Sequence, residues 1–102
     1  MLNIIPNEIP QGVLHQHLLG CVSPRPIAFA STVDEKGNPN IAPYSFFNCF
    51  SSNPPILVFS SNRKGTDNTT KDTLHNVVAT GEVVINMVSH SIVRQMAVAS
   101  IA

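Results

Sequence analysis

The chain has 102 residues, which is enough for one small domain with a single hydrophobic core. Apolar residues make up 43% of it and charged residues 12%, a composition typical of a globular rather than a disordered protein. The formal net charge is zero, which argues against a general polyanion binder, because neutralising many phosphates needs a surplus of Lys and Arg. We therefore expect one domain over residues 1–102, without a nucleic-acid partner.

Cysteine and histidine do not form a metal-binding pattern. Cys21 and Cys49 are far apart, and no CxxC pair is present. The four histidines are scattered along the chain, and we interpret them as surface or packing residues. Two cysteines without a secretory leader pattern predict a cytoplasmic protein. The uninterrupted apolar runs are too short to cross a membrane.

The first predicted elements are an irregular lead-in and a short helix. Residues 1–11 contain two prolines and should be irregular. Residues 12–19 have apolar side chains spaced for one or two helical turns, which Gly20 is expected to end. In the segment SPRP at residues 23–26, two prolines favour an extended backbone.

Three strands are predicted next. Residues 27–33 have the composition of a strand, and residues 34–38 form a hairpin turn in which Gly37 is free to take a positive φ. Residues 39–47 then form the antiparallel partner strand. A third strand over residues 56–60 is apolar enough to be buried on both faces.

A helix follows the polar loop at residues 61–70. Asp72 is a candidate N-cap for a helix over residues 73–79, and Gly81 is expected to close that helix.

The chain ends with a fourth strand and a second helix. Residues 83–88 form the strand, and Ser89 or Ser91 is expected to cap a helix through Ile92 and Met96, whose apolar residues have rough helical spacing. The order β-β-β-α-β-α predicts a mainly β fold with helices, in which a barrel-like sheet carries helical additions.

The loop after the third strand is a candidate phosphate site. Arg63, Lys64 and Lys71 are three of the six basic residues, and they lie within nine positions of a stretch rich in Ser, Thr and Asn. A phosphate needs cationic side chains, hydroxyl donors and free N–H groups at a helix N-terminus. A solvated surface loop has the same composition and remains the alternative. Gly65 is isolated, so neither the Walker pattern nor GxGxxG is present.

Two other segments have features of a binding site. Residues 42–47 (APYSFF) end a strand with small and aromatic residues, against which a flat ring can lie, although aromatic residues at a strand end also suit a core. Arg25 stands between two prolines, where a rigid extended backbone favours bidentate contact with an anion. An ion pair with a local acid such as Asp34 is the alternative for Arg25.

Taken in order, these segments resemble the flavin reductase-like domain family. The resemblance runs from about Cys21 to the last residue and rests on SPRPIAFAST, NIAPYSFFNCFSSNPPILVFSS, NRKGTDNTTKDTLHN and EVVINMV. The family includes flavoredoxins, ferric reductases and the flavin-reducing components of two-component monooxygenases. The resemblance implies a split β-barrel that binds FMN noncovalently, as a homodimer with the flavin near the subunit interface.

The resemblance also implies a set of cofactor-binding residues. The segment that leads into the flavin-facing strand and the hydroxyl pair at the end of that strand correspond to Arg25, Pro26, Ser31 and Thr32. The stretch that borders the isoalloxazine ring corresponds to Pro43, Tyr44, Ser45 and Phe46. The loop and helix start associated with the phosphate and ribityl chain correspond to Ser60, Asn62, Arg63, Lys64, Lys71, Asp72 and Thr73.

The implied activity is an NAD(P)H-dependent flavin or ferric reductase that passes electrons through FMN to a monooxygenase or another acceptor. Hydride transfer requires no acid, base or nucleophile from the protein, so no catalytic residue is assigned. An electron carrier without its own NAD(P)H reaction, like flavoredoxin, and a truncated paralogue without flavin are the alternatives. Family members are usually longer, and we expect an incomplete barrel that self-associates through unpaired edges and an exposed apolar face.

Overall fold

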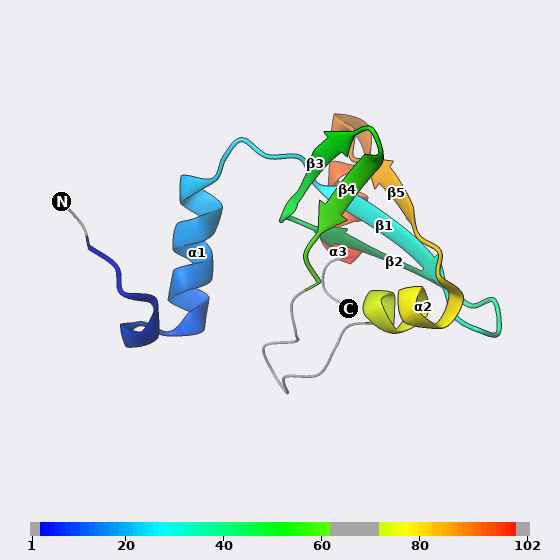
Figure 1. The fold of residues 1–102 in the computed structure, drawn as a ribbon, viewed down its shortest axis with the longest axis horizontal. Coiled ribbons are helices and arrows are strands. Elements are labelled where there is room, and N and C mark those ends of the chain that lie inside the picture. The colour runs from blue at the N-terminus through cyan, green and yellow to red at the C-terminus, as the bar shows by residue number, and fades with distance from the viewer. Residues whose placement is uncertain (1–2, 62–71, 100–102) are drawn as a thin grey trace.

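The computed structural model describes residues 3–61 and 72–99 (Figure 1). Helices and strands follow one another as η1 (Pro6–Glu8), α1 (Gln11–Cys21), β1 (Ala28–Val33), β2 (Pro39–Tyr44), β3 (Phe47–Ser52), β4 (Pro55–Phe59), α2 (Asp72–Thr80), β5 (Val84–Met87), η2 (His90–Ile92) and α3 (Val93–Ala99). Figure 1 shows α1 to one side of the strands. The fold is therefore mixed, with strands at its centre.

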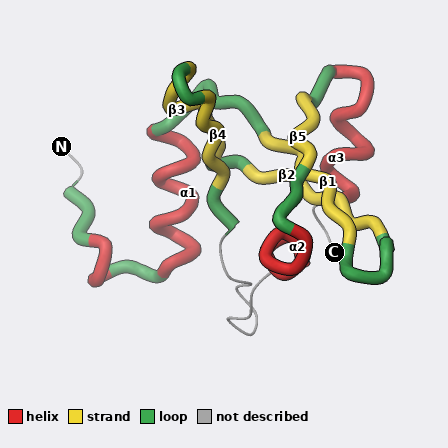
Figure 2. The backbone as a smooth tube through the Cα atoms, turned by 45° about the vertical axis from the view of Figure 1, so that its right-hand side comes forward, coloured by secondary structure: helices red, strands yellow, loops and turns green. Residues whose placement is uncertain are grey.

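The described strands form two antiparallel sheets. The larger has the order β2-β1-β5, with Ala30 of β1 opposite Ala42 of β2 and Ile85 of β5. The smaller is the hairpin of β3 and β4, in which Phe47 lies opposite Phe59. Figure 2 shows this hairpin on the side of the larger sheet that is nearer to α1.

The core lies on the face of β1 that carries small side chains. Ala28 and Ala30 are completely buried, and Tyr44 is 4% exposed. Side chains alternate along a strand, so Thr32 points to the same face as these two alanines. The ring of Tyr44 lies 4.9 Å from that of Phe59, measured between ring centroids, and this contact joins the two sheets.

Two hydrogen bonds between side chains hold α2 on the larger sheet. The Asn76 amide donates to the hydroxyl oxygen of Thr32 at 3.0 Å, and the Asn40 amide donates to that of Thr73 at 3.1 Å. Thr32, Thr73 and Asn76 are all buried. Buried polar groups cost free energy unless they are paired, so these bonds also fix the position of the helix along β1 and β2.

The predicted hairpin turn between β1 and β2 is confirmed. Gly37 has a φ of 84°, which a residue with a Cβ rarely adopts. The Asp34 carboxylate accepts hydrogen bonds from the Asn38 side chain and from the backbone N–H groups of Asn38 and Lys36. These bonds, the one from the Asn38 side chain first, lower the pKa of Asp34 below its usual value.

Two predictions about the strands are wrong. The chain does not run straight from 39 to 47: it turns at Ser45 and Phe46, and a separate strand, β3, begins at Phe47. The strand β4 is not buried on both faces, since Ile56, Leu57 and Val58 are 43–53% exposed. Its described partner is β3 alone, and a two-stranded sheet leaves much of both strands open to solvent.

The helix ends differ in part from the prediction. Gly20 does not end α1, which continues to Cys21. Gly81 does close α2, with a φ of 73° and its N–H donating to the carbonyl of Val77. Asp72 is the first residue of α2 rather than the residue before it.

The last helical segment begins with the short helix η2, which continues into α3. Ser89 precedes η2 without a capping hydrogen bond from its side chain, and its hydroxyl lies 2.9 Å from that of Ser91.

Cys21 and Cys49 are exposed free thiols. Within residues 3–61 and 72–99, His, Cys, Asp and Glu form no group of three that suits a metal ion. The helices in these ranges are also too short or too polar to span a bilayer.

Replacing Asn76 by Ala should destabilise the fold, because the buried Thr32 hydroxyl loses its donor. We expect the free energy of unfolding to fall by about 1–3 kcal/mol, measured by urea denaturation. Val78→Ala on the same helix is the control; Val78 is 78% exposed. The control should change stability by less than about 0.5 kcal/mol. Equal effects of the two substitutions would show that the Asn76–Thr32 bond does not hold α2.

Candidate functional site

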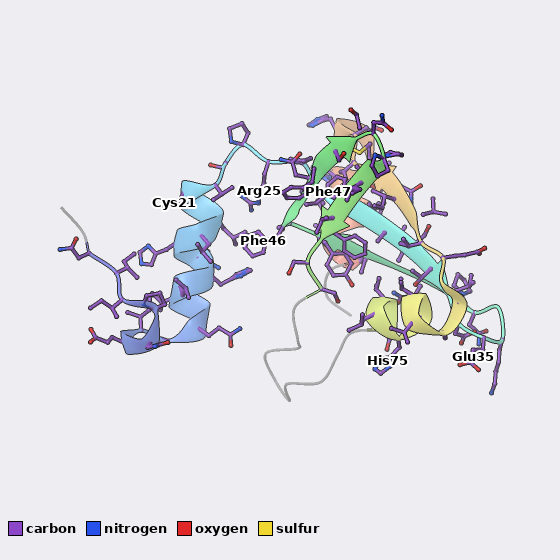
Figure 3. All side chains as sticks on the ribbon, viewed as in Figure 1. Cys21, Arg25, Glu35, Phe46, Phe47 and His75 are labelled. Atoms are coloured by element: carbon purple, nitrogen blue, oxygen red, sulfur yellow. The ribbon has the colours of Figure 1, made fainter. Side chains whose placement is uncertain are left out.

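Three segments far apart in the sequence meet where β2 turns into β3. The N–H of Ser60, just after β4, donates to the carbonyl of Phe46 at 2.9 Å. Arg25, just before β1, donates from Nε to the carbonyl of Ser45, also at 2.9 Å. The Phe46 ring meets the His15 ring of α1 edge-on, with centroids 5.4 Å apart. Figure 3 shows Phe46 between α1 and the strands, with Arg25 above it.

A cavity of about 360 Å³ opens at this turn, and we call it the corner pocket. Its walls are mainly aromatic and aliphatic, with three polar side chains among them. They are formed by Val22, Arg25, Phe46, Phe47, Asn48, Phe50, Val58 and Ser60. An apolar cavity with a few convergent polar groups is typical of a small-molecule site, and its aromatic walls suit a flat ring.

A second cavity of about 300 Å³ lies where β4 ends beside α2, and we call it the α2 pocket. Phe59, Ser61, Thr73, Leu74 and Val77 line it. The Ser61 hydroxyl is buried, and it has no hydrogen-bond partner among the described residues. The first turn of α2 begins here, and the N–H groups of a first turn have no acceptor within their own helix. Hydroxyls and free N–H groups are what an anion such as phosphate needs.

The structure brings together part of the predicted site. Ser45 and Phe46 form the turn, and Ser60 lines the corner pocket. Thr73 lines the neighbouring α2 pocket, and Asp72 stands exposed at the start of that helix. Asn62, Arg63, Lys64 and Lys71 lie outside the described residues.

Ser31 and Thr32 lie away from the corner pocket. Because side chains alternate along β1, the two hydroxyls point to opposite faces of the strand. Thr32 accepts the bond from Asn76, and the Ser31 hydroxyl lies 3.4 Å from the carbonyl of Val84, to which it donates. Both line a separate cavity beside β5. Both hydroxyls thus lie apart from the corner pocket, and their role in cofactor binding stays a prediction.

Three other predicted residues also stand apart from the walls of the corner pocket. The Tyr44 side chain is buried in the core against Phe59. Pro43 pairs with Phe29 within the larger sheet, and Pro26 lines a different cavity, beside η2. Their backbone leads into the site, but their side chains do not line it.

Arg25 binds backbone carbonyls. Its Nη1 donates to the carbonyls of Leu19 at 2.8 Å and Val22 at 2.9 Å, in addition to the bond from Nε to Ser45. The Asp34 carboxylate is bound by Asn38 and Lys36, so the ion pair considered for Arg25 is not the contact that the guanidinium makes. Two of its three nitrogens are thus committed to the protein's own backbone.

Sequence reasoning missed several residues of the two pockets. Asn48, Phe50 and Val58 line the corner pocket, and Ser61 lies in the α2 pocket. The missed strand β3 explains the first two, because both lie on it together with Phe47, and a β-bulge interrupts its pairing with β4 between Cys49 and Ser51. From the sequence, the second strand is predicted to end at residue 47, and no element is predicted over residues 48–52.

The chain is similar to known proteins in sequence and in structure. The sequence pattern of the flavin reductase like domain matches residues 19–102. Nitrilotriacetate monooxygenase component B from Bacillus cereus superposes with a TM-score of 0.86 at 37% identity, over 97% of this chain and 48% of that one. The 2-nitrobenzoate 2-nitroreductase NbaA of Pseudomonas fluorescens gives a TM-score of 0.85 at 30% identity, over 99% and 48%.

Flavoredoxin of Desulfovibrio vulgaris (Miyazaki F) has a TM-score of 0.67 at 27% identity, over 79% of this chain and 41% of that one. Curated relatives, one of them from Aquifex aeolicus (strain VF5), are 36–45% identical, and the chain spans 38–48% of their length. These likenesses confirm the predicted fold class. The chain corresponds to about half of the proteins it matches.

The two hydroxyls of the α2 pocket should respond differently to removal. Ser61→Ala should leave the free energy of unfolding unchanged or raise it by up to about 1 kcal/mol, because it removes a buried hydroxyl that no described group satisfies. Thr73→Val should lower it by about 1–3 kcal/mol, because Asn40 loses its acceptor. Urea denaturation without added ligand measures both, and an equal loss in the two variants would contradict this assignment.

Proposed function

Because the chain belongs to the flavin reductase-like domain family, we propose that it binds FMN noncovalently and contributes the flavin site of an NAD(P)H-dependent flavin reductase. Membership of the family supports a flavin-related oxidoreductase. The finer assignment, FMN as the flavin and NAD(P)H as the reductant, is the proposal. The corner pocket is the observation that carries it.

The two pockets fit the two ends of FMN. The corner pocket has the apolar aromatic walls that an isoalloxazine ring needs, and Asn48 and Ser60 stand at its polar positions. The α2 pocket has the buried Ser61 hydroxyl, which lacks a described partner, beside a helix start, as suits a phosphate. Val58 and Ser60 line the corner pocket, whereas Phe59 and Ser61 line the α2 pocket, so the two pockets lie on opposite faces of the chain at the end of β4. In this proposal one ligand passes around that end to reach both.

Each group of residues has a separate task in this proposal. Phe46, Phe50 and Val58 cover the ring and exclude water, and Asn48 and Ser60 hydrogen-bond to its polar edge. FMN held by these residues would supply the hydride-accepting and electron-transferring chemistry, and the protein's part would be to bind and orient the ring and leave one face accessible.

The phosphate end of the ligand needs positive charge as well as hydroxyls. Ser61, Thr73 and the first turn of α2 are the described groups on that side. The basic residues Arg63, Lys64 and Lys71, which lie between β4 and α2 in the sequence, are proposed to supply the charge.

An absorption titration with FMN tests the binding step. We expect the wild-type chain to shift the visible flavin spectrum, and Phe50→Ala to weaken binding by about 10-fold through the loss of an aromatic contact. Phe50 is 69% exposed, so its truncation should leave the fold intact. Val78→Ala, on the outer face of α2, is the matched control and should bind like the wild type. A wild-type chain that leaves the spectrum unchanged at saturating FMN would rule the proposal out.

Anaerobic addition of NAD(P)H separates the reductase from the alternative that the flavoredoxin likeness supports. Bleaching of the bound flavin band indicates a reductase. A bound flavin that NAD(P)H does not bleach, but dithionite does, indicates an electron carrier. A chain that takes up no flavin fits the third reading, a non-catalytic paralogue.

We also propose that the chain associates with a second copy through the exposed apolar side chains of β4. Leu57 is 53% exposed on one face of the strand, and Ile56 and Val58 are 43% and 47% exposed on the other. Soluble monomers usually cover apolar side chains that lie exposed together. Leu57→Ser should therefore shift the sedimentation coefficient toward that of a monomer. Val78→Ser, which alters an apolar side chain on α2 that is 78% exposed, should not. A wild-type chain that sediments as a monomer at micromolar concentration would contradict this proposal.

A further inference from the structure

Arg25 joins two parts of the chain that otherwise share little contact. Within the described residues, none of the side chains of α1 is buried, and the helix stands to one side of the sheets (Figure 1). The last carbonyls of a helix have no donor within it. Arg25 supplies donors to two carbonyls at this end, those of Leu19 and Val22. A cation is also favourable at the negative end of the helix dipole.

The same guanidinium holds the turn between β2 and β3. Its Nε donates to the carbonyl of Ser45, the residue before Phe46. A planar fork that donates in fixed directions sets the distance between the groups it binds, which a flexible ammonium does not do. Arg25 therefore fixes the end of α1 relative to the turn.

These two ends carry opposite walls of the corner pocket. Val22, whose carbonyl Arg25 binds, lines the pocket from the side of α1. Phe46, which directly follows Ser45, lines it from the side of the strands. The His15 ring, one of the other contacts from α1, meets the same Phe46 ring. The three hydrogen bonds of Arg25, together with this ring contact, thus hold the two walls at their separation.

We propose that Arg25 is a positioning residue of the corner pocket, which sets the gap between Val22 and Phe46 into which the flavin ring fits. This inference rests on the proposed function. It differs from a role in phosphate binding, because the guanidinium acts through the backbone of the pocket walls and toward the ring end of the ligand.

Two flavins that differ only in the phosphate separate these roles. Riboflavin has the ring and ribityl chain of FMN without the phosphate. If Arg25 positions the walls, Arg25→Met should weaken the binding of riboflavin and of FMN by the same factor. We expect this factor to be about 10-fold, because charged hydrogen bonds are lost. If Arg25 bound the phosphate, FMN affinity would fall and riboflavin affinity would not, and this result would overturn the proposal.

Two matched variants distinguish the positioning effect of Arg25 from a general loss of the fold. Arg25→Lys keeps the charge but not the fork, and should recover only part of the affinity for both flavins. Arg94→Met removes an exposed arginine of α3 and should bind both flavins like the wild type. Unchanged affinity for both flavins in Arg25→Met would overturn the positioning role while leaving the proposed function in place.

Amide hydrogen exchange gives a readout that needs no flavin. The N–H of Ser60 is bonded to the carbonyl of Phe46, so loosening the turn should speed its exchange. We expect faster exchange of Ser60 in Arg25→Met than in the wild type or Arg94→Met, with the amides of β1 unchanged. If the wild type binds no flavin, the proposed function fails. The exchange rate of the Ser60 amide then still tests whether Arg25 holds the turn. Equal exchange rates in the wild type, Arg25→Met and Arg94→Met would overturn the positioning role too.

Discussion

The small side chains of β1 are the constraint on which the rest of the structure depends. The side chains of Ala28 and Ala30 are small, so the Tyr44 ring can lie over the sheet and α2 can pack close to β1. Larger residues at these two positions would push the helix and the ring apart, because protein interiors have no spare volume. The position of Tyr44 in turn sets the position of Phe59 and of the hairpin that carries the corner pocket.

Hydroxyl and amide groups in the described part of this chain differ in whether the fold itself supplies their hydrogen-bond partner. Thr32 and Asn76 satisfy each other inside the protein, and so do Asn40 and Thr73. The Ser61 hydroxyl is buried next to them without a described partner. A buried hydroxyl without a partner costs free energy, and the proposed phosphate contact would offset that cost. The distinction depends on which group each hydroxyl faces, and neighbouring sequence positions do not reveal it.

A structural feature could be predicted from the sequence where residues next to one another in the chain determine it, and could not where distant segments do. The turn at Gly37 and the end of α2 at Gly81 follow from local backbone chemistry, and both were predictable. The strand β3 was not, because its residues alternate weakly and follow β2 with only two residues between them. The resemblance to a family predicted that the turn and the helix start belong to a binding site. It did not show that Thr32 faces α2.

The role of Arg25 illustrates the same limit. A guanidinium between two prolines suggests an anion ligand or an acidic partner, because those are the groups that sequence reasoning can count. The carbonyls of Leu19, Val22 and Ser45 become its partners only when a helix ends and a strand turns near the same point. Backbone acceptors carry no sequence signal of their own.

The pairing of β1 on both of its edges has a consequence for synthesis of the chain. Its first partner, β2, follows after a five-residue turn, so this hairpin can form as soon as both strands have left the ribosome. Its second partner, β5, supplies Val84, which lies 53 residues after Ser31. Until β5 has been synthesised, the backbone groups along the second edge of β1 remain unpaired. An unpaired edge of this kind is open to pairing with a chaperone or with another nascent chain.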